Sequence, residues 1–206
     1  MGKFIGPKNK IARRFGVNLG LKTNSAKVAR RIKQAPGQHG AKRRRSSSTF
    51  GKQLNEKQKA KFVYGIREKQ FSKYVKEANK KEGDSGVNLQ RVLELRLDNV
   101  IYRLGFADTR AQARQFVSHS MFIVNGKKMN IPSHILKVGD IIELRANKQK
   151  KKIFENVEEK LSNHELQSWL SIDPSKKQGK VLNLPTEKDY DKIFDVKFII
   201  EYYSTR

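Results

Sequence analysis

The sequence predicts an α+β protein. A mostly helical domain formed by the N- and C-terminal parts carries an inserted module of two helices and a small antiparallel sheet. Apolar residues over 55–80 recur at intervals of three, four and seven, the spacing of one buried helical face. A similar pattern over 91–119 is followed by Asn125-Gly126, the strongest short hairpin signal. These observations predict helices first and paired strands after them.

The first fifty residues are predicted to form a basic, mostly extended segment with little core of its own. They hold 14 Lys and Arg and no Asp or Glu, within a chain of 206 residues and net charge +25. Their dense glycine and proline break helices and let a backbone approach a surface closely. We therefore expect this segment to order mainly on its partner.

The range 51–90 is predicted to supply the helices of the helical domain. Asn55 is the expected N-cap, and Gln58 completes a capping-box pattern three residues later. Gly65 weakens the middle of the pattern over 55–80, so two shorter helices are the alternative to one.

The range 91–146 is predicted to be the inserted module. Its first helix covers about 91–104, and a capping-box pattern starts the second at Thr109. The Asn125-Gly126 hairpin and a strand at 141–144 complete the order helix, helix, strand, strand, strand.

The tail, 147–206, is predicted to complete the helical domain. After a basic run at 148–152 we expect a helix at about 153–161, short strands, and a final strand at 196–203, which is rich in β-branched and aromatic residues. Because the tail is short, we expect it to pack against the helices of 51–90.

The charge distribution favours nucleic acid as the partner. Unpaired cations repel one another in a compact state, whereas on a polyanion they neutralise phosphates and release counterions. A solvated basic tail or a membrane-surface segment is the alternative, although no clean amphipathic helix supports it. No run approaches the roughly 20 apolar residues of a membrane span, so an integral membrane protein is excluded and no membrane partner is expected.

Several kinds of site are excluded by residue types that are missing. Without cysteine, the chain cannot form disulfides, Fe–S clusters or cysteine-based zinc sites. The four histidines lack metal-ligand spacing, and we find no phosphate-binding glycine loop or nucleophile–base pair. We therefore predict no metal, no cofactor, no catalytic residue and no small-molecule substrate. The N-terminus has no apolar signal-peptide core, and we expect a cytoplasmic protein.

Arginines at helical spacing on the two module helices are the sharpest functional feature. They are Arg96, Arg103, Arg110 and Arg114. Such guanidiniums can fork onto successive phosphates or stack on unpaired bases. In the alternative, they form a solvated face and pair with acids of the same stretch, which are Glu94, Asp98 and Asp108.

Further candidate contacts to nucleic acid lie on the basic segment, the helices of 55–80, the second module helix and the hairpin. They are Lys3, Lys8, Arg13, Arg14, Lys22, His39, Arg43, Arg44, Lys57, Lys59, Arg67, Thr109, Ser118, His119, Asn125, Lys127 and Lys128. For His119, a capping or packing role at the end of its helix is the alternative.

An enzymatic alternative starts from Asp98. The string Leu95-Arg96-Leu97-Asp98 is similar to the one that carries the catalytic aspartate of pseudouridine synthases. Here it lies inside an amphipathic helix, and no cleft-forming catalytic domain remains. We therefore predict that the chain is not an enzyme. An RNA-modifying enzyme and a heat-shock or stalled-ribosome RNA binder are the competing classes.

The range 91–145 resembles the two-helix RNA-binding module named after small-subunit ribosomal protein S-four. The motifs that carry this resemblance are Arg96-Leu-Asp-Asn-Val-Ile-Tyr-Arg103, Thr109-Arg-Ala111, Val117-Ser-His119, Val124-Asn-Gly126 and Gly139-Asp140. The flanks extend it to the full-length family through Gly6-Pro-Lys8, Arg13-Arg14, Gln34-Ala-Pro-Gly-Gln-His-Gly-Ala41, Glu68-Lys-Gln-Phe71 and Ile200-Glu-Tyr-Tyr-Ser204. The likeness runs from end to end and is weakest over 150–190.

The resemblance implies a structural constituent of the small ribosomal subunit. Such proteins are primary binders of 16S-type rRNA at a multi-helix junction of the 5′ domain, nucleate assembly of the subunit body and contribute to translational accuracy. It also implies contact with ribosomal protein S-five, with S-twelve as a further candidate, and a position near the mRNA entry channel. Some members bind zinc through four N-terminal cysteines. This chain has none, so its N-terminal segment must be held by RNA and packing.

Overall fold

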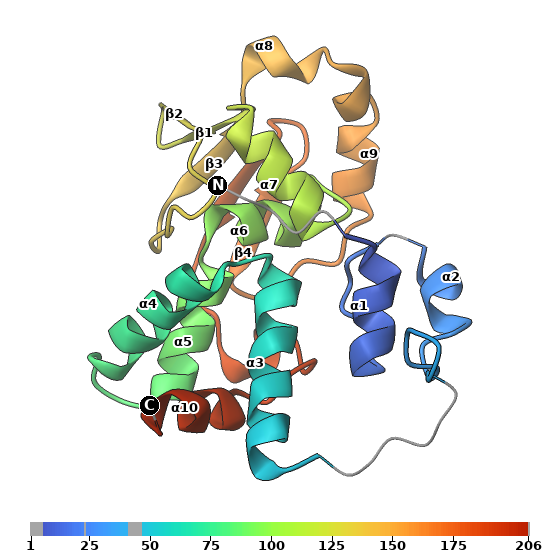
Figure 1. Ribbon diagram of the computed structural model, residues 1–206. Coiled ribbons are helices and arrows are strands. Elements are labelled where there is room, and N and C mark those ends of the chain that lie inside the picture. The colour runs from blue at the N-terminus through green and yellow to red at the C-terminus, as the bar shows by residue number, and fades with distance from the viewer. Residues whose placement is uncertain (1–5, 23, 41–46, 206) are drawn as a thin grey trace. The chain divides into compact units, whose positions relative to one another are not determined.

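The chain divides into two compact units in a computed structural model that describes residues 6–22, 24–40 and 47–205 (Figure 1). The helical unit comprises Met1–Gln90 and Asp191–Arg206, and the sheet unit comprises Arg91–Tyr190. The predicted contact residues Lys3, Arg43 and Arg44 lie outside the described residues.

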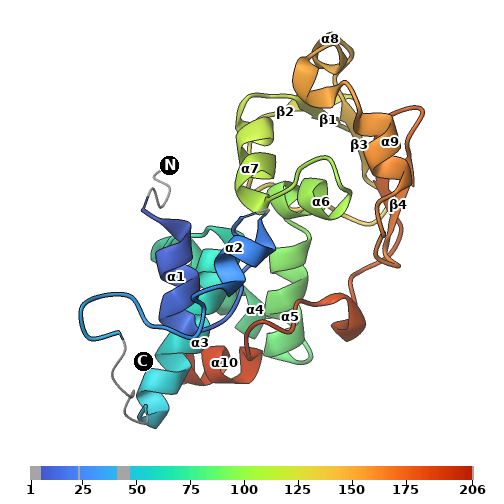
Figure 2. The ribbon, with the colours of Figure 1, turned by 90° about the vertical axis from the view of Figure 1, so that its right-hand side faces the viewer.

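The helical unit is built from short and medium helices. They are α1 (Lys8–Phe15), α2 (Ser25–Ala29), α3 (Thr49–Tyr64), α4 (Glu68–Asn79), the first part of α5 (Ser85–Glu94), and α10 (Val196–Ser204). Figure 2 shows α10 beside α3, where the side-chain amide of Gln53 donates to the Glu201 carboxylate over 3.1 Å.

The expectation of a mostly extended N-terminal segment is wrong for its described part. Helices α1 and α2 lie within it, and Ile11, Leu19 and Val28 are buried. Gly16 is one of the glycines that suggested an interrupted helix, and it forms the left-handed C-cap of α1, with φ 69°. Asn24 caps α2 by accepting from the Lys27 amide. Glycine here ends helices rather than preventing them.

The helical pattern over 55–80 is two helices, as the alternative reading of Gly65 predicted. Gly65 has φ 62° and ends α3, and α4 starts three residues later. The expected N-cap at Asn55 is wrong, because Ser48 caps α3 by accepting from the Gly51 amide over 3.2 Å.

The predicted final strand at 196–203 is also wrong, since this run forms α10. Asp195 caps the helix by accepting from the Lys197 amide, and Ile199 and Tyr202, three residues apart, are buried on one face. Packing against α3 therefore overrides the β-preference of the side chains.

The sheet unit starts with the end of α5 and combines helices with a five-stranded sheet. Its other elements are α6 (Leu97–Arg103), α7 (Arg110–Ser118), β1 (Phe122–Val124), β2 (Lys127–Met129), β3 (Ile141–Leu144), α8 (Ala146–Gln149), the 3-10 helix η1 (Lys152–Phe154), α9 (Val157–Ser162), β4 (Leu170–Asp173), β5 (Gln178–Val181) and the 3-10 helix η2 (Glu187–Asp189). The single helix expected at 91–104 is interrupted, because Arg96 leaves helical geometry and forms an isolated bridge with Ile135.

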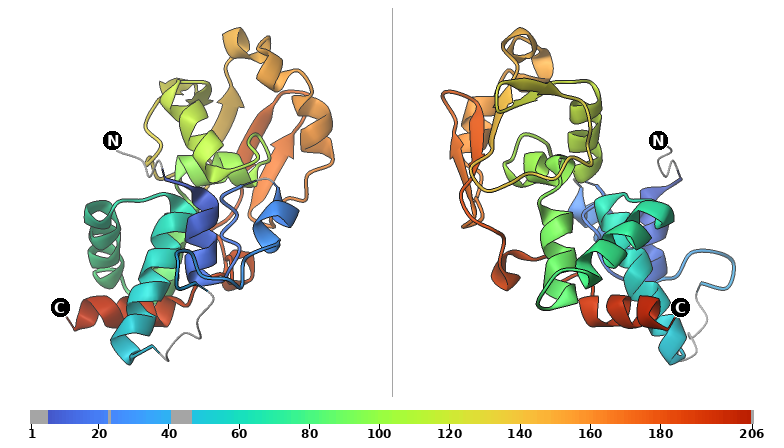
Figure 3. Two further views of the ribbon diagram at one scale, coloured as in Figure 1. Left: turned by 45° about the vertical axis from the view of Figure 1, so that its right-hand side comes forward. Right: turned by 90° about the vertical axis from the view of Figure 1, so that its left-hand side faces the viewer.

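The strand order is β2-β1-β3-β5-β4, with every pair antiparallel. The Asn125-Gly126 hairpin is confirmed, with Val124 opposite Lys127. Strands β4 and β5 continue the sheet beyond β3 (Figure 3). The range 147–190 was expected in the helical domain, but it belongs to this unit because its strands pair here.

The core of the sheet unit gathers apolar side chains from its helices and from one face of the sheet. It includes Leu97, Val100, Ile101, Ala113, Phe116, Val117, Phe122, Val124, Ile142, Leu144, Phe154, Leu161, Trp169, Leu170 and Val181. The α+β fold class with helices and a small antiparallel sheet is confirmed. None of the helices within the described ranges has the length and apolar character to cross a membrane.

Candidate nucleic-acid interface

Asp98 forms ion pairs with two of the four arginines that were predicted to contact nucleic acid. Arg96 donates from Nε and Nη2 to its two carboxylate oxygens over 3.0 and 2.7 Å, and Arg114 donates from Nη1 over 2.9 Å. Arg96 is 1% exposed and Asp98 4% exposed. The prediction that Arg96 contacts RNA is therefore wrong for this conformation. The enzymatic alternative also fails here, because Asp98 is buried and committed to two guanidiniums.

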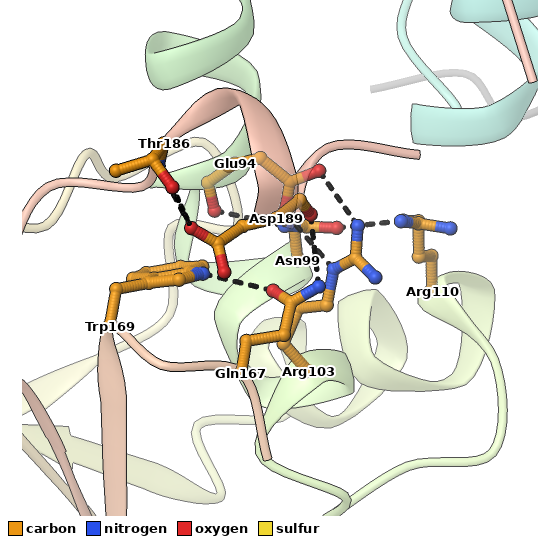
Figure 4. Close-up of polar contacts among 8 residues, drawn as sticks. All are labelled: Glu94, Asn99, Arg103, Arg110, Gln167, Trp169, Thr186 and Asp189. Atoms are coloured by element: carbon orange, nitrogen blue, oxygen red, sulfur yellow. Dashed lines mark hydrogen bonds and ion pairs between the residues drawn. The ribbon is translucent and has the colours of Figure 1, made fainter. Parts of the chain in front are cut away.

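Glu94 forms the second centre of this network (Figure 4). Its carboxylate is fully buried and accepts from Arg103 Nε and Nη2 over 3.1 and 2.9 Å. Asn99 Nδ2 donates to the same carboxylate over 2.7 Å and to the Glu94 backbone carbonyl over 2.9 Å. A buried carboxylate is stable only when it is paired and hydrogen-bonded in this way.

Arg110 is held by its neighbours in the same unit. Its Nε donates to Asn99 Oδ1 over 2.7 Å, and its guanidinium carbon lies 4.6 Å from the centre of the Tyr102 ring. The amide of Asn99 therefore connects Arg110 to Glu94 (Figure 4). The arrangement joins α7 to α6 and to the end of α5.

The alternative interpretation of the arginine face is thus partly right. Glu94 and Asp98 do pair with the arginines, but in buried sites rather than on a solvated face. Asp108 pairs with Lys160 instead. Arg103, Arg110 and Arg114 are half-buried, and their contact with RNA stays a prediction.

A neighbouring set of polar contacts stabilises the end of the sheet unit (Figure 4). Burial alone would raise the pKa of Asp189, but hydrogen bonds from the Thr186 hydroxyl and backbone and from Ser168 outweigh it and lower this pKa. Gln167 donates to the Asp189 carbonyl over 3.0 Å and accepts from Trp169 Nε1 over 2.9 Å. These bonds fix the segments that flank β4.

The hairpin presents cations of a different kind. Lys127 and Lys128 on β2 are exposed, and no ion pair within the described chain involves either. Asn125 has φ 50°, donates to Asp140 over 2.8 Å and accepts from the Ile141 amide over 2.9 Å. Asn125 therefore shapes the turn that carries the two lysines.

A basic run that the predicted contacts omitted follows β3 and α8. Lys150, Lys151 and Lys152 follow α8, are exposed, and form no ion pair with any residue whose position is described. Met129 and Leu144 both lie opposite Phe122, so the end of β3 is two strand spacings, about 10 Å, from β2. The sequence signal was visible as a lysine run without acids. Because the sequence analysis assigned this lysine run to the helical domain, the run was not considered together with the hairpin of the inserted module.

Two predicted contacts of the helical unit are structural. Lys57 is 4% exposed, with Nζ 3.0 Å from a Glu68 oxygen and 4.3 Å from the centre of the Tyr202 ring, so its predicted RNA contact is wrong here. Lys59 forms an ion pair with Glu56 over 2.6 Å, and its side chain is largely buried.

Glu68 joins α3, α4 and α10. Burial alone would raise its pKa, but hydrogen bonds from Lys61, Tyr203 and Lys57 outweigh burial and lower the pKa to about 2. The Tyr203 hydroxyl donates over 2.6 Å, which ties the last helix to the start of α4. Arg67, directly before α4, is exposed.

The predicted contacts in the N-terminal segment differ in their surroundings. Arg14, Lys22 and His39 are exposed, and Lys8 is half-buried. Arg13 donates to two backbone carbonyls further along the segment. Its guanidinium therefore holds the backbone of the segment by hydrogen bonds, a role that the residue type alone did not indicate.

The remaining predicted contacts lie on α7. Thr109 caps the helix by accepting from the Gln112 amide over 3.2 Å, as its sequence pattern predicts. The Ser118 hydroxyl donates to the Arg114 carbonyl, and exposed His119 interacts with Gln115. Across residues 6–22, 24–40 and 47–205, no cluster of His, Asp and Glu could hold a metal ion.

Comparison with known proteins gives one consistent result. The model of the ribosomal protein S4/S9 N-terminal domain matches residues 3–94, and that of the S4 domain matches 95–142. Small ribosomal subunit protein uS4 of Sulfurihydrogenibium sp. is 46% identical, covering 99% of this chain and 100% of the relative. The uS4 proteins of Herpetosiphon aurantiacus and Aquifex aeolicus are each 45% identical, covering 99% of this chain and 100% and 99% of the relatives. The chain therefore belongs to the uS4 family of small ribosomal subunit proteins, a family of structural, RNA-binding ribosomal proteins and not of enzymes.

Proposed function

We propose that the protein is a primary binder of the 5′ domain of 16S-type rRNA and nucleates assembly of the body of the small subunit. The observation that supports this most directly is the division of its cations. The arginines of α6 and α7 pair within the fold, whereas lysines of the hairpin and of 150–152 are exposed and have no acidic partner among the described residues. Exposed cations that the fold does not use are suited to phosphates.

The proposed mode of binding is recognition of RNA shape. A-form helices hide their base edges in a deep, narrow groove, so phosphates and 2′-hydroxyls are what side chains reach. Lys127 and Lys128 lie on a short edge strand, and the run at 150–152 follows a one-turn helix that comes after β3. A folded junction presents phosphates from more than one helix and can therefore engage both groups of lysines.

The finer partners belong to the same proposal. We place the protein beside ribosomal protein S-five, with S-twelve as a further neighbour, and close to the mRNA entry channel, where it contributes to translational accuracy. What supports these partners is membership of the uS4 family and the basic first fifty residues.

Footprinting on naked 5′-domain rRNA tests the function. We expect the purified protein to protect a contiguous junction of that domain without any other ribosomal protein present. The control is a large-subunit rRNA fragment of equal length at the same ionic strength. Equal protection of both RNAs would contradict the proposal, because it would show charge-driven binding without recognition of a site.

A further inference from the structure

We propose that Arg13 is a positioning residue for RNA binding, which holds the turn at residues 35–40 in shape, and is not itself a phosphate contact. The inference rests on the proposed function, since the turn is taken as part of the surface that meets folded RNA. It assigns a role that differs in kind from that of Arg14, the next residue in α1.

The guanidinium of Arg13 donates hydrogen bonds to two successive backbone carbonyls. Its Nε donates to the Gln34 carbonyl over 2.9 Å, and its Nη2 donates to the Ala35 carbonyl over 3.1 Å. Two neighbouring donors of a rigid planar fork match two neighbouring acceptors, which the single ammonium of lysine cannot reproduce. The fork therefore fixes both the position and the direction of the backbone that enters the turn.

The turn is closed from its other side by glycine. The Gly40 amide donates to the Gly37 carbonyl over 3.1 Å, and Gly37 has φ 99°. A Cβ added to Gly40 would lie 1.9 Å from the Ala35 carbonyl oxygen, too close for any side chain. The Ala35 carbonyl thus accepts from Arg13 and lies so close to Gly40 that a side chain at position 40 would disturb it.

Helix α1 gives Arg13 a firm base. Ile11 and Ala12, directly before it, are buried, and the helix ends in a left-handed cap at Gly16. The side chain that donates to the turn thus comes from a helix whose position is fixed by buried residues. A long cationic side chain held in one rotamer loses entropy, and two charge-assisted hydrogen bonds offset that loss.

The turn presents groups that suit folded RNA. Gln38 and His39 are exposed at its tip, and the flanking glycines let a backbone come close to a ligand surface. The surrounding segment holds cations such as Lys33 and no carboxylate, so a polyanion meets no repulsion there. Phosphates and 2′-hydroxyls of an RNA helix are the chemistry that this tip would meet.

Arg14 supplies the matched control. It carries the same charge in the same helix, but it is exposed, and its guanidinium carbon lies 5.9 Å from the ring centre of Phe15. Replacing either arginine by lysine preserves the net charge. Arg13→Lys removes the fork, and Arg14→Lys removes only an exposed guanidinium.

The test measures binding to 5′-domain rRNA over a range of salt, together with amide hydrogen exchange of the free full-length protein. For Arg13→Lys we expect about tenfold weaker binding, an unchanged slope of log K against log salt, and faster exchange at Gly40. Arg14→Lys should show wild-type exchange at Gly40, because it leaves both hydrogen bonds of Arg13 to the turn in place. Exchange in α3 reports whether each variant keeps its fold.

A second variant reaches the same turn without changing Arg13. Gly40→Ala introduces the clash with Ala35 and should weaken binding by a similar factor, again without changing the salt slope. Because both variants break one structure, Arg13→Lys combined with Gly40→Ala should cost little more than either alone.

Two results would overturn the inference. One is wild-type affinity and wild-type exchange for Arg13→Lys, with a salt slope lowered by about 0.7 to 0.9 for Arg13→Ala, which would make Arg13 a phosphate contact. The other is additive loss in the double variant. If the wild type and Arg14→Lys both fail to bind, the proposed function fails instead, and Gly40 exchange still decides whether Arg13 holds the turn.

Discussion

Two basic regions of the sheet unit use their charge in opposite ways. Around α6 and α7, the arginines turn toward Glu94 and Asp98 and join the helices. On β2 and at 150–152, the lysines are exposed and no described acid pairs with them. The difference follows from the acids, since carboxylates are interleaved with the arginines and absent from both lysine groups. Counting cations therefore locates nucleic-acid contacts only after internal acids have been assigned.

The largest expected effect comes from breaking the arginine network at its centre. Glu94→Ala leaves Arg103 and Asn99 without their buried acceptor and should lower the free energy of unfolding of the sheet unit by about 3–5 kcal/mol. Urea unfolding followed by fluorescence of Trp169, the one tryptophan of the chain, measures this.

The matched control for that prediction is Glu143→Ala. Glu143 lies on β3 in the same unit and is half-exposed, so its loss should change the unfolding free energy by less than about 0.5 kcal/mol. Equal losses in the two variants would contradict the account of Glu94 as the centre of a buried network.

Removal of the hairpin charge should weaken RNA binding and leave the stability of the fold unchanged. Lys127→Gln with Lys128→Gln should leave unfolding unchanged, because neither lysine pairs within the described fold. Binding to 5′-domain rRNA should weaken about tenfold, and the salt slope should fall by about 1.5, which corresponds to two phosphates. Lys188→Gln with Lys192→Gln, both exposed in the charge-balanced tail, is the control and should keep the slope.

A smaller effect is expected at the edge of the network. Arg110→Ala removes one hydrogen bond to Asn99 and the contact with the Tyr102 ring, so it should cost about 1–2 kcal/mol of unfolding free energy. Arg110→Lys should recover only part of that loss. Chemical denaturation measures both, and full recovery by lysine would show that charge alone matters there.

The smallest effect concerns acid and the helical unit. The folded pKa of Glu68, about 2, is below its ordinary value of 4.5, so its ionised form stabilises the fold above pH 4.5, and this contribution disappears as the pH falls through about 2. Glu68→Gln should therefore lower stability at neutral pH and match the wild type near pH 2. Circular dichroism during urea unfolding measures the loss of helix, to which α3, α4 and α10 contribute. A difference that grows toward acid would have the wrong sign.

The sequence predicted the elements whose signals are local. The Asn125-Gly126 turn, the cap at Thr109 and the break at Gly65 each depend on a few adjacent residues, and all three are present. The run at 196–203 was misassigned because its preference for strand is weaker than burial of Ile199 and Tyr202 on α3. Pairing of β5 with β3 joins residues far apart in the chain, and no local pattern encodes it.

The candidate contacts also divide into those that local sequence indicates and those that depend on residues far apart in the chain. Exposure of Lys127 and Lys128 follows from a short hairpin, which the sequence indicates. Burial of Lys57 and Arg96 depends on partners that only the folded chain brings together. Helical spacing placed the arginines on related faces, yet it could not show that those faces point toward carboxylates.

Lysine reactivity with and without RNA tests the central claim most directly. Acetylation of the intact protein, mapped by mass spectrometry, should modify Lys127, Lys128 and the lysines at 150–152 when the protein is free. In complex with 5′-domain rRNA these positions should become protected, while Lys188 stays reactive. Equal reactivity of the hairpin lysines in both states would contradict the account, because the exposed cations would then not be what RNA covers.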